Sequence, residues 1–321
     1  DHMKKRNIII AMVLAMAMTT VGGATVFAAD EKAEGNDYTI AYVPTTMNNP
    51  FWTAMMGGIK EEMEAKGMDV DKQLVTVDAN SDQATMNNYV NDLIAQQVDA
   101  IILAPMDCTA VTEALTACEE AGIPVINVDT AVDATDKVVS IIASDNYKAG
   151  VECAEDMMSK LDKGAKIAVM NRPSGTACVQ REKGFLDTAG DYFEIVSTTD
   201  TEGDTAKTMT AAEDVLTADD DLAGFFCIND MGALGCVQAA QAAGKEDLLI
   251  YGVDGNPDFM GYVADGSATA SAAQQPSVIG QKALDAAIDT LDGKEVEHDQ
   301  VVDVVLINKD NIADFDVTDW Q

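Results

Sequence analysis

The chain has 321 residues, enough for about two domains. Its residues are 47% hydrophobic and 23% charged, a composition that excludes collagen-like, disordered and disulfide-scaffold proteins. The formal net charge is -35, and a surface this acidic repels phosphate groups, so we expect no nucleic-acid partner. The two histidines, His2 and His298, are too few for a catalytic histidine triad or a multi-histidine metal site.

Residues 1–29 are predicted to comprise a cloning scar and a secretory signal peptide. The basic residues 4–6 precede the apolar run 8–18, and small residues follow up to Ala28, which is the order of a signal peptide. The alternative is a membrane anchor, but the apolar run is shorter than the ~20 residues that span a bilayer. We therefore expect an exported protein, located in the periplasm or at the extracellular face of the cell membrane.

From Tyr38 onward, short runs rich in Val and Ile alternate with helical stretches. The predicted strands occupy residues 38–43, 74–77, 100–104, 125–128, 138–143, 166–170, 195–197, 224–228, 248–253, 268–272 and 301–306. The predicted helices occupy residues 52–66, 81–96, 109–121, 147–161, 177–189, 205–217, 231–243 and 277–291. Gly122, Gly190 and Gly244 are expected to end three of these helices.

The pattern indicates an α/β fold. Several predicted strands are continuously apolar, which is typical of parallel strands covered by helices on both faces. One compact unit does not hold so many strands, and the pattern after Asp145 repeats the pattern after Tyr38, so we predict two doubly wound parallel-sheet lobes. The alternative is a closed barrel of eight βα units, which is less favoured because no helix separates strands 125–128 and 138–143.

The six cysteines do not form the pattern of a disulfide framework. Cys227 lies inside an apolar run, and Cys153 and Cys236 lie in Ala-rich stretches, where cysteine acts as a small apolar residue. Cys108 and Cys118 bracket one predicted helix, and about ten helical residues span about 15 Å, well beyond the roughly 4.4–6.8 Å between the Cα atoms of a disulfide. No C-x-x-C pair is present, so we expect neither a zinc site nor another metal site.

Short polar side chains follow several predicted strands at their carboxyl ends: Thr45, Asn49, Asp107, Asp129, Asn229, Asp230 and Asp254. In open parallel sheets, ligands bind outside those ends. Few cations accompany these residues, and the aromatic residues Phe51 and Trp52 follow the first strand. The combination suits a neutral polyhydroxylated ligand, because carboxylates and amides bind vicinal hydroxyls and an aromatic face covers the C–H patches of a sugar ring.

Each of these residues also has a simpler explanation. Asn229 or Asp230 could cap the helix 231–243, and a cap is about as frequent as a ligand role at such a position. Phe51 and Trp52 could be core aromatics. Asp204 is interpreted as a helix cap.

The segment Asn49-Pro50-Phe51-Trp52 belongs to a set of motifs that is specific in combination. The others are Ile123-Pro124-Val125-Ile126-Asn127-Val128-Asp129, Ala143-Ser144-Asp145-Asn146, Arg181-Glu182-Lys183-Gly184-Phe185, Asn229-Asp230 with Ala233-Leu234-Gly235, Gly252-Val253-Asp254-Gly255 with Pro257-Asp258, and Gln274 before Pro276. With this set the chain resembles the periplasmic sugar-binding proteins of ABC transporters, closest to the ribose-binding type, over residues 38–307.

The resemblance implies the fold of a type I periplasmic binding protein, in which a sugar sits between two lobes joined by three hinge strands. These strands would cross near Ser144, Gln274 and Asp303. The lobes implied are an N-terminal lobe of residues 30–144 with 275–303 and a C-terminal lobe of residues 145–274 with 304–321.

Carried over by position, the family's ligand contacts fall on Thr45, Asn49, Phe51, Trp52, Asp129, Asn229, Asp254 and Gln274. Three positions depart from the ribose-binding pattern. Thr130 and Val179 stand where that pattern has arginines, and Gly203 stands where it has its second-lobe aromatic. An unmet buried hydrogen-bonding group costs about 1–3 kcal/mol, so the resemblance implies a sugar clamp without fixing ribose as the ligand. Thr130 remains a candidate ligand-binding residue.

Two arginines follow the predicted signal peptide. Arg181 matches a family position that we interpret as structural. Arg172 has no family counterpart and is either a surface residue or a replacement hydrogen-bond donor in the cleft. We include Arg172 among the candidate ligand-binding residues.

The resemblance implies a receptor that captures a pentose, hexose or related polyol and delivers it to an ABC permease. It would act as a monomer without cofactor or catalytic residues, and a chemoreceptor is a second partner to consider. One alternative is a binding protein for a sugar-derived signalling molecule. Another is a secreted sugar-processing enzyme, although we find no G-x-x-x-x-G-K-[ST] and no G-x-S-x-G motif. A cytoplasmic repressor with the same clamp is disfavoured by the export signal and the acidic charge.

Overall fold

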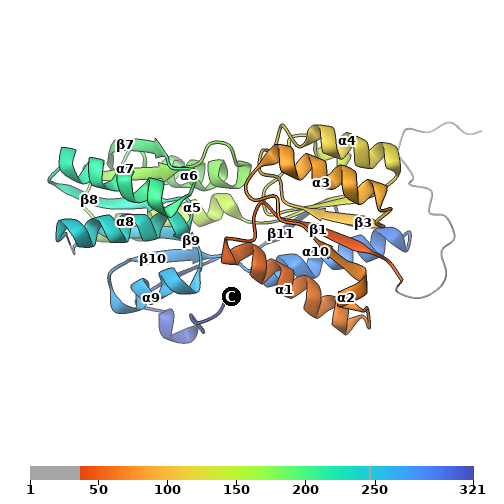
Figure 1. The fold of residues 1–321 in the computed structure, drawn as a ribbon. Helices are drawn as coiled ribbons and strands as arrows, with labels where there is room; N and C mark the ends of the chain where they lie inside the picture. The colour runs from red at the N-terminus through yellow and green to blue at the C-terminus, as the bar shows by residue number, and fades with distance from the viewer. Residues whose placement is uncertain (1–36, 246) are drawn as a thin grey trace, which may run out of the picture.

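The computed structural model describes residues 37–245 and 247–321. The predicted cloning scar and signal peptide, residues 1–29, lie outside the described residues. Within the described part, two six-stranded sheets lie side by side, each flanked by helices on both faces (Figure 1). The predicted α/β fold with two doubly wound lobes is therefore confirmed.

The first sheet has the strand order β11-β5-β4-β3-β1-β2, and all of its neighbouring strands are parallel. Its strands are β1 (Ile40–Val43), β2 (Leu74–Thr76), β3 (Ala100–Leu103), β4 (Val125–Val128), β5 (Ser140–Ser144) and β11 (Asp299–Val302). Every residue of β1, β3 and β4 is buried. β1 and β3 are apolar throughout, and β4 is apolar apart from Asn127, because helices cover both faces of these central strands.

Alternate residues of each central strand point to opposite faces of the first sheet. Tyr42 packs with helices on one face, whereas Val43 packs with helices on the other. The helices on the Tyr42 face are α1 (Pro50–Ala65) and α10 (Pro276–Leu291), and those on the Val43 face are α3 (Gln83–Ala95) and α4 (Thr112–Ala121). We call this sheet the first lobe, together with these helices and the short elements α2 (Val70–Gln73) and η1 (Thr135–Lys137).

The second sheet has the strand order β12-β10-β9-β8-β6-β7. Its strands are β6 (Lys166–Asn171), β7 (Glu194–Asp200), β8 (Leu222–Cys227), β9 (Leu249–Asp254), β10 (Ala270–Ala273) and β12 (Val305–Asn308). Phe226 packs with α5 (Asn146–Lys160) and α6 (Thr176–Ala189), whereas Phe225 packs with α7 (Thr205–Ala218), α8 (Asp230–Ala243) and α9 (Pro257–Asp265). We call this sheet with these helices the second lobe.

The predicted strand 301–306 is wrong, because two strands in different sheets occupy this stretch. β11 pairs with β5 in the first sheet, and β12 pairs antiparallel with β10 in the second. A run of apolar residues has the same sequence pattern whether it forms one strand or two. Only the pairing with distant strands shows that this run forms two. α9 is not among the predicted helices, although Asn256 caps it and Pro257 begins it, a combination that is a recognised start signal.

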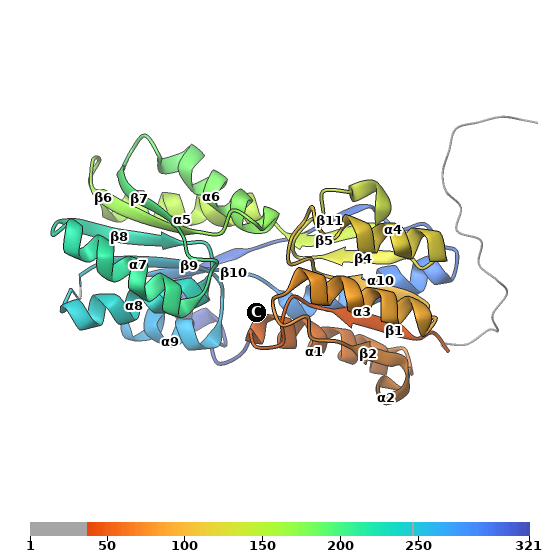
Figure 2. The same cartoon turned by 45° about the horizontal axis from the view of Figure 1, so that its top comes forward.

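The described chain passes between the two lobes at three places (Figure 2). It leaves the first sheet after β5, returns from β10 into α10, and crosses again between β11 and β12. The predicted lobe boundaries are not tested and remain a prediction. The three connections lie side by side, and elsewhere the lobes meet through side-chain contacts such as the hydrogen bond from Thr176 Oγ1 to the carbonyl of Ala131 at 2.9 Å. Such an arrangement permits the lobes to move about the connections.

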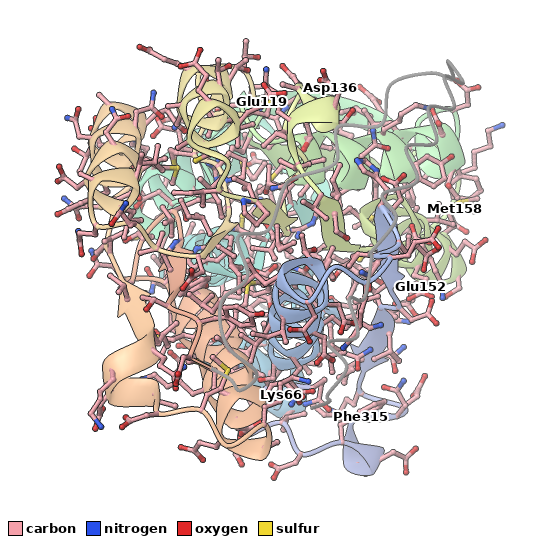
Figure 3. The ribbon with its side chains drawn as sticks, turned by 90° about the vertical axis from the view of Figure 1, so that its right-hand side faces the viewer. Lys66, Glu119, Asp136, Glu152, Met158 and Phe315 are labelled. Carbon is pink, nitrogen blue, oxygen red and sulfur yellow. The ribbon has the colours of Figure 1, made fainter. Side chains whose placement is uncertain are left out.

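The surface cations lie among many carboxylates. Lys66, labelled in Figure 3 near α10, forms ion pairs with Glu62 of its own helix at 3.1 Å and with Asp285 of α10 at 2.6 Å. Exposed pairs of this kind contribute only about 0–1 kcal/mol each. They fasten neighbouring helices without providing the main stability of the fold, which comes from the apolar packing above.

All six cysteines lie in the described residues and are free thiols. Five of them are buried, and burial raises the pKa of the Cys118 thiol to about 12. The Sγ atoms of Cys227 and Cys236 lie 3.5 Å apart, at hydrogen-bonding distance and without a disulfide bond. A thiol as strongly protonated as that of Cys118 is a poor nucleophile at neutral pH, and the buried cysteines act as small apolar core residues.

Candidate functional site

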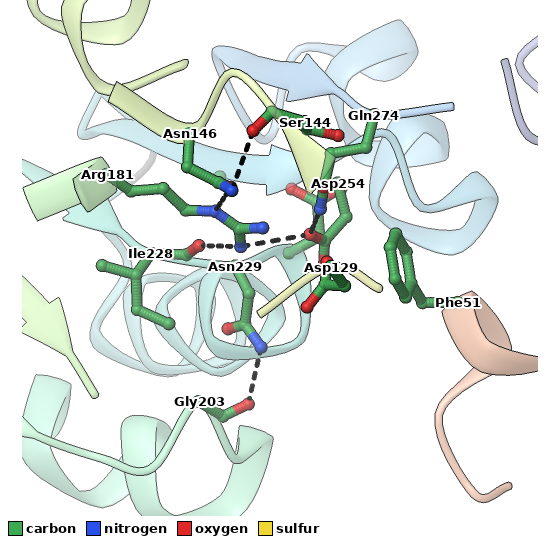
Figure 4. Close-up of polar contacts among 12 residues, drawn as sticks. Phe51, Asp129, Ser144, Asn146, Arg181, Gly203, Ile228, Asn229, Asp254 and Gln274 are labelled. Carbon is green, nitrogen blue, oxygen red and sulfur yellow. Dashed lines mark hydrogen bonds and ion pairs between the residues drawn. The ribbon is translucent and has the colours of Figure 1, made fainter. Parts of the chain in front are cut away.

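A cavity of about 390 Å³ lies between the lobes, at the carboxyl ends of strands from both sheets. The structure brings all of the sequence-predicted site residues to its lining: Thr45, Asn49, Phe51, Trp52, Asp129, Thr130, Arg172, Asn229, Asp254 and Gln274. The first six come from the first lobe and the remaining four from the second lobe or the connection behind it. Figure 4 shows the polar contacts at the centre of this cavity.

The turn between β1 and α1, together with the first residues of α1, supplies six of the lining residues. Asn49 caps α1, and its side-chain oxygen accepts a hydrogen bond from the backbone N–H of Phe51 at 3.0 Å. Phe51 and Trp52 belong to the core of the first lobe and also line the cavity, with ring centroids 5.0 Å apart in an edge-to-face arrangement. Asn49 is therefore both a helix cap and a cavity residue, and Phe51 and Trp52 are both core and cavity residues. A capped and packed turn presents its aromatic rings in fixed orientations.

Asp129 and Thr130 follow β4 in a turn that Asn127 braces. The Asn127 amide donates to the carbonyl of Thr130 at 2.9 Å, and Thr130 Oγ1 donates to the Asp129 carboxylate at 2.7 Å. Asp129 has a φ of 63°, in the left-handed region that residues other than glycine seldom adopt. The turn holds this strained residue so that its nearly buried carboxylate faces the cavity.

Asp254 at the end of β9 is the corresponding carboxylate of the second lobe. Its Oδ1 accepts hydrogen bonds from Gln274 Nε2 at 2.6 Å and from Arg181 Nη1 at 3.3 Å (Figure 4). Its φ of 138° also lies in the strained region. Among the described residues, Gln274 Oε1 is buried without a hydrogen-bond partner, so it can accept a hydrogen bond from a ligand hydroxyl.

Arg181 is the main residue that the sequence analysis underrated. Its guanidinium is 4% exposed and also donates to Asn146 Oδ1 and to the carbonyl of Ile228, both at 2.8 Å. Arg181 is therefore structural, as interpreted, but it also lines the cavity beside Asp254. A close approach of α5 to α6 places it, because a Cβ atom added to Gly150 would lie 2.0 Å from the carbonyl oxygen of Arg181. The sequence offered one hint of this role, because Arg181 is one of only three arginines in the sequence.

Asn229 caps α8 and lines the cavity at the same time. Its oxygen accepts from the N–H of Gly232 at 2.9 Å, and its amide nitrogen donates to the carbonyl of Gly203 at 3.1 Å. Gly203 has a φ of 67°, and a Cβ atom added there would lie 2.7 Å from the Asn229 amide nitrogen. Only glycine fits this position without strain. The aromatic side chain that the resemblance implies for position 203 would therefore not fit here.

Arg172 also reaches the cavity, from the loop between β6 and α6. Its Nη2 donates to the carbonyl of Met106 in the first lobe at 3.3 Å, and its Nε lies 3.4 Å from Ser174 Oγ. Of the two explanations left open, an ordinary surface residue fits less well than a donor at the cavity. The guanidinium bridges the lobes at the cavity wall.

Two strand-end aspartates do not reach the cavity lining. Asp230 is fully buried behind it, where it accepts from the N–H of Asn256 at 2.7 Å and pairs with Ser271 Oγ at 2.8 Å. Burial and the charge of Asp254 raise the pKa of Asp230 well above its usual value. Asp107 accepts hydrogen bonds from its own turn, at Thr109. A position at a strand end therefore does not by itself distinguish a supporting carboxylate from one that faces the cavity.

The charges around the cavity nearly balance. Its lining residues carry four carboxylates and three cations, and two ion pairs join Asp254 to Arg181 and Glu202 to Lys207 at 3.3 and 2.6 Å. Burial raises the pKa of Asp254 to about 6, and Arg181 opposes this rise. A nearly neutral cavity that is rich in hydrogen-bonding groups can hold an uncharged ligand with several hydroxyls.

Residues 40–295 match the family model of the periplasmic binding protein domain. The chain is a periplasmic binding protein. This periplasmic binding protein is 36% identical over 262 residues to the ribose import binding protein RbsB of Bacillus subtilis (strain 168), an alignment that covers 81% of this chain and 84% of the relative. It is 33% identical over 310 residues to the protein of the same name from Salmonella typhimurium, with 96% and 99% of the two chains covered.

Solved structures agree with this assignment. An ABC transporter solute-binding protein of Agrobacterium vitis with bound D-fucose has a TM-score of 0.79 at 31% identity, covering 85% of this periplasmic binding protein and 96% of that chain. A periplasmic solute-binding protein of Actinobacillus succinogenes with bound D-allose has a TM-score of 0.80 at 26% identity, covering 87% and 100%. The resemblance to sugar-binding proteins of ABC transporters is thereby confirmed.

Proposed function

We propose that this periplasmic binding protein captures a monosaccharide, namely a pentose, a hexose or a related polyol, between its lobes and delivers it to an ABC permease. The observation that carries the proposal is the convergence of Asp129 from one lobe with Asp254 and Asn229 from the other on one cavity beside Phe51. The relatives described above include a ribose import binding protein and proteins solved with bound D-allose and D-fucose, which supports a sugar as the ligand class.

The chemistry of the lining suits a sugar ring. Each carboxylate can accept hydrogen bonds from two neighbouring hydroxyls, and Gln274 Oε1 offers a further acceptor. Arg172 can donate to ring or hydroxyl oxygens in place of the arginines that the ribose-binding pattern has elsewhere. Among the described lining residues, the aromatic rings are those of Phe51 and Trp52, both on the first lobe. We therefore propose that the C–H face of the sugar lies against the first lobe and its hydroxyl edge faces the second.

Binding would close the lobes around the three connections. The moving units are the proposed lobes, residues 30–144 with 275–303 and residues 145–274 with 304–321. A sugar shifts the balance toward the closed form only because it contacts both lobes there and one lobe in the open form. A micromolar dissociation constant corresponds to ~8 kcal/mol, which several buried hydrogen bonds and one stacked ring can provide after the ordering costs.

We propose export to the periplasm or the extracellular face of the membrane, where the closed monomer docks on the permease and, as a second partner, on a chemoreceptor. In the described part of the chain, no helix combines the length and the apolarity needed to span a membrane. We propose binding without catalysis, and incubation with the bound sugar should return it unchanged by mass spectrometry.

The first experiment is a ligand screen on the purified protein. It should be unfolded and refolded to remove any co-purified ligand, then tested by thermal shift against pentoses, hexoses, polyols and sugar-derived signalling molecules. A cognate sugar at 100 times its dissociation constant adds about 2.7 kcal/mol to the free energy of unfolding. Asp254→Ala and Asn229→Ala should abolish this gain while the sugar-free proteins still unfold cooperatively. A screen in which no sugar raises the melting temperature would refute the proposal.

A further inference from the structure

The last residues of the chain connect the two lobes a fourth time, without belonging to either sheet. After β12 and the turn η2 (Ile312–Asp314), Phe315 and Val317 pack against the core of the second lobe. Trp320, three residues further on, packs against the core of the first lobe. Phe315 is labelled in Figure 3, and Figures 1 and 2 both place the C-terminus between the lobes beside the start of α1.

The indole of Trp320 contacts the ring of Phe51, which lines the cavity. Its centroid lies 5.7 Å from that of Phe51, with an interplanar angle of 75°. Trp52 contacts the same ring at 5.0 Å and 90°. Phe51 is therefore held edge-to-face by two tryptophans, one from its own helix and one from the far end of the chain, and it is only 3% exposed.

Phe51 lines the cavity, and next to the cavity lies a groove of about 550 Å³. The residues that line the groove include Pro50, Thr53, Ser277 and Trp320. Asn48 lines both hollows, so they adjoin at this residue. Without the Trp320 indole, the ring of Phe51 would lose its packing partner on the groove side and gain freedom to turn out of the cavity wall.

The tail fixes the direction of Trp320 through its own hydrogen bonds. The Asp316 carboxylate accepts from Thr318 N–H at 3.1 Å and from Thr318 Oγ1 at 2.6 Å. Gln321 Nε2 donates to the carbonyl of Asp316 at 2.9 Å. Hydrogen bonds within the tail therefore hold this turn. Phe315, before the turn, packs against the second lobe, and the Trp320 indole, at its other end, packs against the first lobe.

We propose that Trp320 is a positioning residue that sets the orientation of Phe51 for sugar binding, and that the tail, residues 309–321, straps the second lobe to this aromatic. The inference rests on the proposed function. Because the strap spans both lobes, a movement of one lobe against the other changes the contact between Trp320 and Phe51. Sugar binding and the surroundings of Trp320 are coupled through this contact.

The first test compares two substitutions of Trp320 with a matched control, using D-ribose, D-allose and D-fucose as probes. Trp320→Ala should weaken binding of whichever probe binds the wild type by about 3- to 10-fold, the range of an edge-to-face aromatic contact. Trp320→Phe should restore the affinity to within about twofold, because a ring again meets Phe51. Tyr192→Ala removes a similar edge-to-face contact, with Phe193, at the far side of the second lobe. It should lower the melting temperature and leave the affinity unchanged.

The second test is spectroscopic and uses the two tryptophans of the chain. In Trp52→Phe, Trp320 is the sole tryptophan, and its emission should change on titration with the sugar, saturating at the dissociation constant that calorimetry gives for the same variant. An emission that does not respond to bound sugar, or a Trp320→Ala protein that binds as tightly as the wild type, overturns the inference alone. A wild type that binds none of the probes and no other sugar of the screen overturns the proposed function and, with it, this inference.

Discussion

Lowering the pH from 7 to 5 should weaken sugar binding, because the ionised Asp254 carboxylate accepts hydroxyl hydrogen bonds at both oxygens, whereas protonation occupies one oxygen and removes the charge that strengthens these bonds. Burial raises the pKa of Asp254 to about 6 in the sugar-free protein, Arg181 opposes the rise, and Asp129 adds to it. The carboxylate is 6% exposed, so bulk solvent does little to restore its usual pKa. The protonation of one buried group therefore falls inside an accessible pH range.

The signs for stability and for affinity are opposite. The pKa of Asp254 is raised from 3.8 in the folded protein, so its contribution to the stability of the sugar-free fold is fully present below about 3.8 and is lost as the pH rises through about 6. A bound sugar donates hydrogen bonds to the ionised form and lowers the pKa again. Binding therefore releases a proton at low pH, and the affinity rises with pH over the window in which the stability contribution falls.

The expected size follows from the fraction of ionised Asp254. If only the carboxylate binds, the apparent dissociation constant grows about twofold at pH 6 and about 11-fold at pH 5 relative to its limit at high pH. The change between pH 7 and pH 5 is then about tenfold, or about 1.4 kcal/mol of binding free energy. At pH 5 each bound sugar should release about one proton.

Calorimetric titrations at pH 5, 6 and 7, each in two buffers of different ionisation heat, measure both the affinity and the proton release. His298→Gln is the matched control, because His298 is a titratable group that is hydrogen-bonded to Asp299 and Thr135 away from the cavity, and the hydrogen bond with Asp299 raises its pKa above the usual 6.5. This variant should keep the full pH dependence. Equal affinity at pH 5 and pH 7 with no proton release would show that Asp254 is not the acceptor we propose.

Two further substitutions test how the cavity is built. Gly203→Ala should weaken sugar binding measured by calorimetry, because φ is 67° and the new methyl would lie 2.7 Å from the Asn229 amide; an unchanged affinity would contradict this. Gly150→Ala should lower the melting temperature by several degrees, since a methyl 2.0 Å from the Arg181 carbonyl costs about 1–3 kcal/mol. Its control is Gly57→Ala in α1, where a Cβ atom meets nothing within 4 Å, and this change should leave the melting temperature equal or higher.

Some cavity residues are recognisable from the sequence because the residues next to them along the chain define their local structure. Asn49 and Asn229 each stand where a strand ends and a helix begins, and a cap residue is recognisable from that position alone. The fold class was predictable for a similar reason, because strands buried on both faces, such as β3, leave no polar position in their sequence. These features depend on a few consecutive residues.

Contacts between distant segments had no such local signal. Arg181 and Asp254 are 73 positions apart, and nothing near either residue specifies the other. The stretch 301–306 shows the same limit, since its break into β11 and β12 follows from pairing with β5 and β10. The contact of Trp320 with Phe51 likewise joins the two ends of the described chain.

By itself, then, the sequence determined the βα alternation, the caps, and the set of polar residues at the carboxyl ends of the strands. These features are visible because backbone geometry and burial impose a periodic pattern of apolar and polar residues along the chain. Only the tertiary structure decided which of those residues face one cavity, which support it from behind as Asp230 does, and which partner each one meets. Such partnerships are fixed by how closely helices and sheets pack, as at Gly150 against Arg181, and close packing is a property of surfaces that meet only in the folded chain.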